Sequence, residues 1–388
     1  MGLRWSPANM SKKNLVLLTV ISLLAYLLVE KTKVARKEAF FDEKIAAAEK
    51  MKSALDVIKD YYTIHEDPES DIENYSTTEL LGKFSSDITT DFGKLSAKAI
   101  SLNPNFAAVI VDMLKKANLK SGDIVAIGCT GSFPGVNIAT YSAVEILGMK
   151  PVTISSVGSS MWGANDPQMT WVDMEKLLIE KKIFSFRSVA ASLGGIDDQA
   201  KGIGYNGRKL IRTAIQRNNL TLIEEKTLDA SIKRRMAIYN EASNGAPIKL
   251  YINIGGGIAS LGSRINGQLI KPGLRKRLKL KNFQQEGVIT IMASQGIPVI
   301  NLINISEIAK RYNLPQDPTI IPAVGNGSIF SSQIYRLELI LTTLVTLTVL
   351  LFALSKSNIY LWTAHKISRF INRFLFKQSA LGGQKQNS

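Results

Sequence analysis

The sequence predicts an α/β fold, in which a mainly parallel, doubly wound sheet forms an extracytoplasmic domain between an N-terminal and a C-terminal transmembrane helix. Three observations lead to this prediction. Two long uncharged apolar runs lie near the ends of the chain of 388 residues. Between them, short apolar runs alternate with stretches of helical periodicity. Several of the short runs are followed directly by glycine and serine, as at the carboxyl edge of a parallel sheet.

The two apolar runs predict membrane anchors. The first, "NLVLLTVISLLAYLLV", covers residues 14–29 and ends in "AYLLVEK". Small residues normally precede a signal-peptide cleavage site, so this ending favours an uncleaved anchor over a cleaved signal peptide. The second, "LILTTLVTLTVLLFAL", covers residues 339–354. Both are slightly shorter than the roughly 20 residues that usually span a bilayer. Buried core helices are the alternative, but neither run carries a charged stripe.

Basic residues set the expected orientation. By the positive-inside rule the C-terminal tail stays in the cytoplasm, because it holds basic residues and no acidic one: Lys356, Lys366, Arg369, Arg373, Lys377 and Lys385. Two spans then place both termini in the cytoplasm and the main domain outside the cytoplasmic membrane. The expected division is a cytoplasmic N-terminus with the first span at 1–30, an amphipathic helical stalk and linker at 31–75, the extracytoplasmic α/β domain at 76–334, the second span at 335–355 and the basic tail at 356–388.

The α/β domain is predicted from its alternating elements. Apolar runs indicate strands at residues 124–127, 151–154, 188–191, 221–223, 249–254 and 298–302. Helical periodicity indicates helices at residues 136–147, 171–181, 207–217 and 228–242. Strands that alternate with helices in this way are typical of βαβ units and a parallel sheet covered on both faces.

The charge of the chain points to anionic partners. The formal net charge is +16, and residues 1–30 and 336–388 carry +2 and +6 of it, which leaves +8 for the middle. A basic outward-facing domain attracts polyanions, with "KRR" (residues 233–235) and "RKRLKLK" (residues 275–281) as local basic clusters. An ordinary solvated face is the alternative. Nucleic acid is excluded as the expected partner, because aromatic residues do not interleave with these charges and the domain is expected outside the cell.

The glycine-rich turns predict a ligand site on one edge of the sheet. "GCTGSFPG", "SSVGSSMWGAND", "SLGGIDD" and "GGGIASLGS" each follow a predicted strand, and glycine allows a close approach of backbone to ligand. The helix expected from about Val136 would add unpaired N–H groups for a phosphate or carboxylate. The expected ligand-binding residues are Gly128, Thr130, Gly131, Ser132, Ser159, Ser160, Gly194, Gly195, Gly255, Gly256 and Gly257.

Several classes of site are excluded by the motifs. The turn after residues 124–127 lacks the lysine and hydroxyl residue of a Walker loop, and it does not follow the G-x-G-x-x-G dinucleotide pattern, so a nucleotide is disfavoured and no cofactor is expected. No cluster of cysteine and histidine exists, so no metal site is expected. The single cysteine, Cys129, lies in an apolar strand end and is expected to be packed and inert.

The sequence leaves open whether the site is catalytic. Ser132 lies at a strand-to-helix turn, where hydrolases place a nucleophile, but helix capping is the favoured role because His65 is the only histidine expected on the same side of the membrane. Asp166, Asp197 and Asp198 follow predicted strands on the same edge and are the other candidates, as general base, metal ligands or hydrogen-bond acceptors. Turn formation explains each of them equally well.

The two terminal apolar runs, the turn "GCTGSFPGVNIA", the stretch "SSVGSSMWGANDP" and the later "INIGGGIASLG" are similar to the family called poly-gamma-glutamate system protein. This resemblance covers most of the chain and carries no catalytic residue with it. It implies bacterial machinery that makes and exports poly-γ-glutamate at the membrane, with the poly-γ-glutamate ligase and membrane components of the same system as partners. The expected function is a membrane-anchored accessory of synthesis or export that binds the polymer's carboxylates. A surface hydrolase or transferase that releases, trims or attaches the polymer is the alternative.

Overall fold

The structure is a computed structural model that describes residues 11–65, 80–279, 283, 285–317 and 322–354. The chain divides into two compact units. The main unit covers Lys37–Ser332, and the terminal unit combines Met1–Arg36 with Gln333–Ser388.

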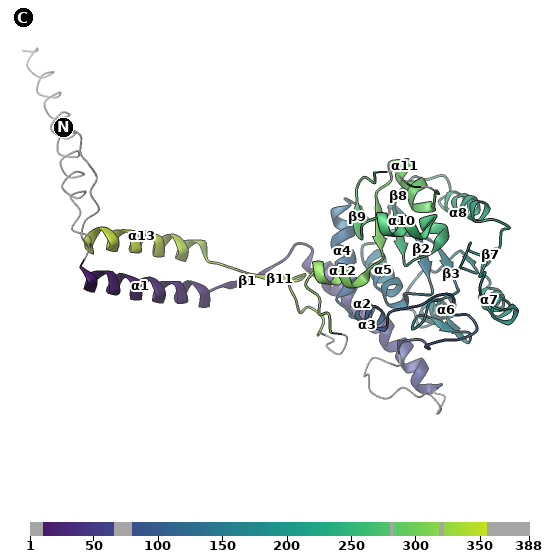
Figure 1. The fold of residues 1–388 in the computed structure, drawn as a ribbon, viewed down its shortest axis with the longest axis horizontal. Coiled ribbons are helices and arrows are strands. Elements are labelled where there is room, and N and C mark those ends of the chain that lie inside the picture. The colour runs from purple at the N-terminus through teal and green to yellow at the C-terminus, as the bar shows by residue number, and fades with distance from the viewer. Residues whose placement is uncertain (1–10, 66–79, 280–282, 284, 318–321, 355–388) are drawn as a thin grey trace, which may run out of the picture. The chain divides into compact units, whose positions relative to one another are not determined.

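A seven-stranded sheet forms the centre of the main unit (Figure 1), with the strand order β7-β6-β3-β2-β8-β10-β9. Every neighbouring pair is parallel except β10 and β9. The predicted α/β class with a mainly parallel sheet is therefore confirmed. The strands are β2 (Ile124–Thr130), β3 (Lys150–Ser156), β6 (Ala190–Ser192), β7 (Thr221–Ile223), β8 (Ile248–Ile254), β9 (Gly273–Arg275) and β10 (Val299–Leu302).

Side chains from successive residues of one strand enter two separate cores. In β2, Val125, Ile127 and Cys129 belong to one buried cluster, whereas Ala126 belongs to the other. This is the period-two alternation of a strand that is covered on both faces, and it explains why the strand reads as one continuous apolar run.

Helices cover both faces of this sheet. The first cluster includes α2 (Phe41–Ile64), α4 (Phe106–Lys116), α5 (Pro134–Ile146), α6 (Trp171–Glu180) and α7 (Tyr205–Arg217). The second includes α8 (Leu228–Ala242), α9 (Ile258–Leu261) and α11 (Val288–Ser294). Shorter elements complete the unit: α3 (Leu95–Ile100), α10 (Arg264–Leu269), α12 (Ile305–Arg311) and the small hairpin of β4 (Asn165–Asp166) and β5 (Met169–Thr170).

The order of the strands reverses direction at the centre of the sheet. From β2 the chain proceeds outward through β3, β6 and β7, and it then returns to the other side of β2 with β8. In open parallel sheets a crevice forms where the order reverses, outside the carboxyl ends of the two central strands. Here those ends are Thr130 and Ile254, and each is followed by a glycine-rich turn.

The segment expected as a stalk has a different structure. The helix of the first span ends at Lys31, and α2 begins at Phe41 as a separate helix. Its residues Ala47, Met51, Leu55 and Ile58 are buried in the core of the main unit. The apolar periodicity correctly predicted a helix, but the apolar face of this helix packs against α4 and α5, so the helix is not an independent stalk. Residues 66–75 of the expected linker lie outside the described residues.

The terminal unit contains two apolar helices, α1 (Lys12–Lys31) and α13 (Leu337–Leu354). Both are long and apolar enough to cross a membrane, and none of their residues is buried in the folded chain. The two helices contact each other, and the side-chain amide of Asn14 donates to the carbonyl of Leu354 at 3.2 Å. Two short strands, β1 (Val34–Lys37) and β11 (Ser331–Ile334), pair with each other. The expected tail at 356–388 lies outside the described residues.

Candidate functional site

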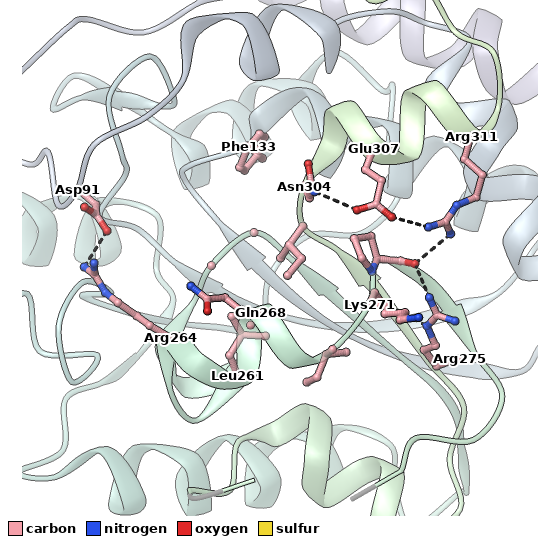
Figure 2. Close-up of a pocket in the computed structure, with 16 residues that line it drawn as sticks. Asp91, Phe133, Leu261, Arg264, Gln268, Lys271, Arg275, Asn304, Glu307 and Arg311 are labelled. Carbon is pink, nitrogen blue, oxygen red and sulfur yellow. Dashed lines mark hydrogen bonds and ion pairs between the residues drawn. The ribbon is translucent and has the colours of Figure 1, made fainter. Parts of the chain in front are cut away.

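Two adjoining pockets lie where the glycine-rich turns meet. The switch-point pocket has a volume of about 350 Å³ and is lined by turns that follow β2, β3, β6 and β8. The basic pocket has a volume of about 1020 Å³ and lies beside it (Figure 2). The two share the lining residues Asp91, Phe133, Gly256 and Arg264. The expectation that these turns come together at one edge therefore agrees with the geometry.

Most of the expected ligand-binding residues line one of these pockets. Thr130, Ser132, Ser160, Gly195, Gly256 and Gly257 line the switch-point pocket, and Gly255 lines the basic pocket. The others have structural positions among the described residues. Gly128 lies inside β2, where an added Cβ would be 2.5 Å from the Tyr251 hydroxyl, and an added Cβ at Gly131 would be 2.6 Å from the Val157 carbonyl oxygen. Gly194 has a φ of +75°, and the buried Ser159 hydroxyl donates to the Gly131 carbonyl at 3.0 Å.

The first turn of α5 does not line either pocket. Helix α5 begins at Pro134, one residue after Phe133, and proline has no N–H to offer an anion. An added Cβ at Gly135 would be 2.6 Å from the Ser101 carbonyl oxygen, so this end of the helix packs against protein. The expected site at the helix N-terminus is thus replaced by the turn before it, where Thr130, Ser132 and Phe133 face the pocket.

Ser132 does not cap α5. Its hydroxyl oxygen instead accepts the N–H of Ser160 at 3.0 Å, which joins the turn after β2 to the turn after β3. Among the described residues no histidine side chain lies beside it, since the ring of His65 stacks on Tyr61 at the end of α2 and lines neither pocket. The favoured capping role of Ser132 is therefore wrong, and a triad through His65 has no support.

Asp166 and Asp197 have ordinary surroundings. Asp166 lies in β4, where its carboxylate accepts the N–H of Gln168 at 2.9 Å and lies 3.5 Å from Lys83, outside both pockets. Asp197 does line the switch-point pocket, but it is half exposed and pairs with Lys201 at 2.6 Å. Turn formation and a surface ion pair account for both residues.

Asp198 belongs to a buried ion pair. Its carboxylate lies 3.0 Å from the guanidinium of Arg235 and also accepts the hydroxyls of Ser192 and Ser231 at 2.6 and 2.5 Å. The pair ties the loop after β6 to α8, and it holds Asp198 at a φ of +61°, which non-glycine residues rarely adopt. Arg235 is therefore a buried structural residue and not part of a surface cluster, as "KRR" had indicated.

Lys98, which no sequence pattern marked as a site residue, is the most unusual charge at the site. This lysine of α3 is only 2% exposed. Its ammonium donates to the carbonyl of Ser132 and, at 2.8 Å, to the hydroxyl of Ser160, and it lies 3.8 Å from the centroid of the Phe133 ring. No carboxylate within the described residues forms an ion pair with it. Burial lowers the pKa of Lys98 to about 7.

Thr130 supplies a second polar group without a partner. Its hydroxyl is buried at the end of β2, lines the switch-point pocket and has no hydrogen-bond partner among the described residues. The backbone of the neighbouring turn approaches closely, since an added Cβ at Gly255 would be 2.4 Å from this hydroxyl. Gly255 also has a φ of +80°, so glycine is required there for both reasons.

The basic pocket gathers several cations (Figure 2). Arg311 pairs with Glu307 and Arg264 pairs with Asp91, each at 2.8 Å. Arg275 donates to the carbonyls of Lys271 and Pro272 and has no carboxylate partner in the described part of the chain. Burial and the nearby Arg311 lower the pKa of Arg275. The ammonium of Lys271 also lacks an acidic partner there, so the pocket has positive charge available for an anion.

The thiol of Cys129 is shielded from solvent. Cys129 is buried beside Tyr141, and burial raises the pKa of its thiol. Within residues 11–65, 80–279, 283, 285–317 and 322–354, no group of three or more histidine, cysteine, aspartate or glutamate side chains is placed to hold a metal ion.

Comparisons with known proteins add little to this geometry. No family model and no curated protein matches the chain. One solved structure, an archaeal alanine:glyoxylate aminotransferase, is similar at 13% identity, over 84% of this chain and 62% of that chain, with a TM-score of 0.16. The chain thus spans less than two thirds of that protein, and a score this low carries no argument about fold or activity. The resemblance to the poly-gamma-glutamate system proteins stays a prediction.

Proposed function

We propose that the protein is a membrane-anchored accessory of poly-γ-glutamate synthesis or export, and that its main unit holds the carboxylates of this anionic polymer. The observation that carries the proposal is the basic pocket. It places Lys271 and Arg275, which lack carboxylate partners in the described chain, next to a pocket lined by glycine turns. Such a surface is suited to a chain with a carboxylate on every repeat.

The chemistry of the pocket favours carboxylates over other anions. Arginine binds a carboxylate through two parallel N–H bonds, and charge-assisted hydrogen bonds are about twice as strong as neutral ones. The nucleotide motifs are missing, and the pocket rim offers Phe133 as an aromatic residue but no series of aromatic rings for stacking bases. A flexible polyanion without bases fits these properties best.

We further propose that both termini lie in the cytoplasm and that the main unit lies outside it. The two apolar helices and the basic residues after position 355 support this topology. The poly-γ-glutamate ligase and membrane components of the same system are the proposed partners, since polymer leaving the membrane would meet the main unit first. The resemblance alone supports these partners.

Cysteine labelling in whole cells tests the topology. The native thiol is buried, so the unmodified chain should remain unlabelled by a membrane-impermeant maleimide. Thr213→Cys places a thiol on the exposed side of α7, and Ser388→Cys places one at the C-terminus. We expect labelling of Thr213→Cys in intact cells and labelling of Ser388→Cys only after permeabilisation. The reverse pattern would refute the topology.

Binding of γ-linked glutamate oligomers to the full-length protein in detergent tests the carboxylate site. Lys271→Gln with Arg275→Gln should weaken binding about 10-fold or more at physiological salt, because two charge-assisted contacts are lost. The matched control is Lys209→Gln with Lys233→Gln, which removes the same charge from exposed positions on α7 and α8. This control should change binding less than about 2-fold, because neither lysine lines the basic or the switch-point pocket and both charges are screened by salt. Equal losses in both double variants would refute the site.

A further inference from the structure

The contact between Lys98 and Ser160 has the geometry of a nucleophile with its base. The two residues are 62 positions apart in sequence, yet the Lys98 nitrogen lies 2.8 Å from the Ser160 hydroxyl oxygen. Ser160 is 9% exposed and lines the switch-point pocket. Lys98 does not line the pocket and lies behind the serine, shielded from water. This distance is within the reach required for proton transfer.

The surroundings of Lys98 favour its neutral amine. A buried lysine normally has a carboxylate beside it, because an unpaired buried charge is costly. Lys44 shows the usual arrangement in this chain, at 3.5 Å from Asp112. Within the described part of the chain, the partners of the Lys98 amine are a carbonyl, a hydroxyl and the Phe133 ring, and burial lowers its pKa to about 7. A sizeable fraction of the amine is therefore free to accept a proton near neutral pH.

The remaining contacts orient this pair. The Lys98 amine donates to the Ser132 carbonyl, which leaves its lone pair available for Ser160. The Ser132 hydroxyl accepts the backbone N–H of Ser160, which fixes the turn that carries the nucleophile. Ser132 is thus a positioning residue, and the neighbouring serine makes the reactive contact. The unpartnered Thr130 hydroxyl lines the same pocket and is available to donate to a substrate oxygen.

We infer that Ser160 and Lys98 form a catalytic dyad for acyl hydrolysis or acyl transfer on an amide bond of a carboxylate-bearing chain. The identity of that chain rests on the proposed function, whereas the dyad rests on its own geometry. The adjoining basic pocket would hold the carboxylates while an amide of the same chain reaches Ser160. The dyad would make the protein a hydrolase or transferase of the polymer, and neither Ser160 nor Lys98 was among the catalytic candidates from the sequence.

The reaction balances without a cofactor. Neutral Lys98 takes the proton of the Ser160 hydroxyl as the serine oxygen bonds to the amide carbon, and the carbonyl electron pair moves to its oxygen. When the carbonyl re-forms, the carbon–nitrogen bond breaks and Lys98 returns the proton to the leaving amine. Water, or a second amine in a transfer reaction, then attacks the serine ester with Lys98 as base. As the ester bond breaks, Lys98 returns this proton to the serine oxygen. The products are the leaving amine, the released acid or the new amide, and free Ser160 with neutral Lys98.

A covalent serine probe tests the dyad directly. We expect the full-length protein in detergent to react with a fluorophosphonate, and peptide mapping to place the adduct on Ser160. Lys98→Met, a neutral side chain of similar length, should slow labelling about 100-fold or more, because general-base catalysis contributes at least that much. Labelling of the wild type should also become faster as pH rises through about 7, as Lys98 loses its proton.

A matched variant separates catalysis from folding. Ser142→Ala removes a buried hydroxyl of α5 that lines neither pocket. We expect Ser142→Ala to keep labelling within a few-fold of the wild type, whereas Ser160→Ala abolishes it. Labelling that is unaffected by Lys98→Met, or an adduct on another serine, would overturn the dyad.

The outcomes for dyad and polymer are distinguishable. Oligomer binding without any Ser160 adduct would refute the dyad and leave the proposed function intact. A Ser160 adduct without oligomer binding would support the dyad and refute the polymer as its ligand. Shortening of γ-glutamate oligomers by the wild type, lost in Ser160→Ala, would support both.

Discussion

Two buried cations near the carboxyl edge of the sheet have opposite surroundings. Arg235 lies 3.0 Å from the Asp198 carboxylate and is also held by Ser156 and Ser192. Lys98 is equally buried but has a carbonyl, a hydroxyl and an aromatic ring as its partners. The paired cation fixes a loop of the fold. The cation without a carboxylate partner can lose its proton or bind an anion. The presence of a counterion, and not burial alone, therefore distinguishes a structural charge from a functional one.

Breaking the ion pair of Asp198 and Arg235 should have the largest effect on the free energy of unfolding. Asp198→Ala leaves the guanidinium of Arg235 buried without its counterion, and such a loss lowers the free energy of unfolding by about 3–5 kcal/mol. Urea denaturation of the full-length protein in detergent measures this. Combining Asp198→Leu with Arg235→Met should recover most of the stability, because neither charge then remains buried. An unchanged urea midpoint for Asp198→Ala would contradict the structural role of the pair.

The unpaired cation should make stability rise with pH. The folded pKa of Lys98 is about 7 against a reference value of 10.5, so between these values the unfolded chain binds more protons than the folded one. The free energy of unfolding should therefore increase by about 2 kcal/mol between pH 7 and pH 9. Lys98→Met should lack this contribution. If both proteins show the same pH dependence over this range, Lys98 stays charged in the folded protein, and its surroundings do not differ in effect from those of Arg235.

A buried carboxylate that forms no ion pair among the described residues should make stability change with pH in the opposite direction. Glu175 accepts hydrogen bonds from Tyr141 and Ser188, and burial raises its pKa to about 7 from 4.5. Here the folded chain binds more protons, so stability should fall by about 2 kcal/mol as pH rises from 5 to 7. Glu175→Gln should flatten this part of the profile. A profile that keeps its slope in Glu175→Gln would show that another group titrates.

An exposed pair should have the smallest effect. Asp197 is the immediate neighbour of Asp198, but its ion pair with Lys201 is open to solvent. Surface pairs contribute about 0–1 kcal/mol, so Asp197→Ala should shift the free energy of unfolding by no more than that. The same urea denaturation compares the two neighbouring aspartates. A loss as large as that of Asp198→Ala would mean that the loop conformation, and not the buried pair, carries the stability.

Much of the fold follows from local patterns in the sequence. The runs at 124–127, 221–223 and 249–254 were predicted as strands because buried parallel strands are continuously apolar, and the structure confirms them as β2, β7 and β8. The meeting of the glycine turns was predicted because parallel strands share a carboxyl edge. Helix α4 was missed, since its residues Phe106–Leu114 are buried all round and lack a polar face that would mark a helical period.

The chemistry of the site depends on contacts that no local pattern encodes. Ser132 and Ser160 both follow a strand, and only the fold determines which of them faces Lys98. Lys98 itself stands in the short apolar segment "LSAKAI", where nothing marks it as buried. In the sequence, Asp198 cannot be distinguished from its neighbour Asp197. Only the ion pair with Arg235, which comes from a later helix, gives Asp198 a different role. The pairing of charges that are far apart in the sequence could therefore not be predicted from the sequence.

The reaction of the full-length protein with an activated γ-glutamyl ester examines the switch-point pocket and its ligand together. We expect a γ-glutamyl adduct on Ser160 that forms faster as pH rises through about 7 and about 100-fold more slowly in Lys98→Met. In Lys271→Gln with Arg275→Gln, a higher ester concentration should be needed to reach the same rate. No adduct on Ser160, or an adduct whose rate does not depend on Lys98, would contradict the dyad.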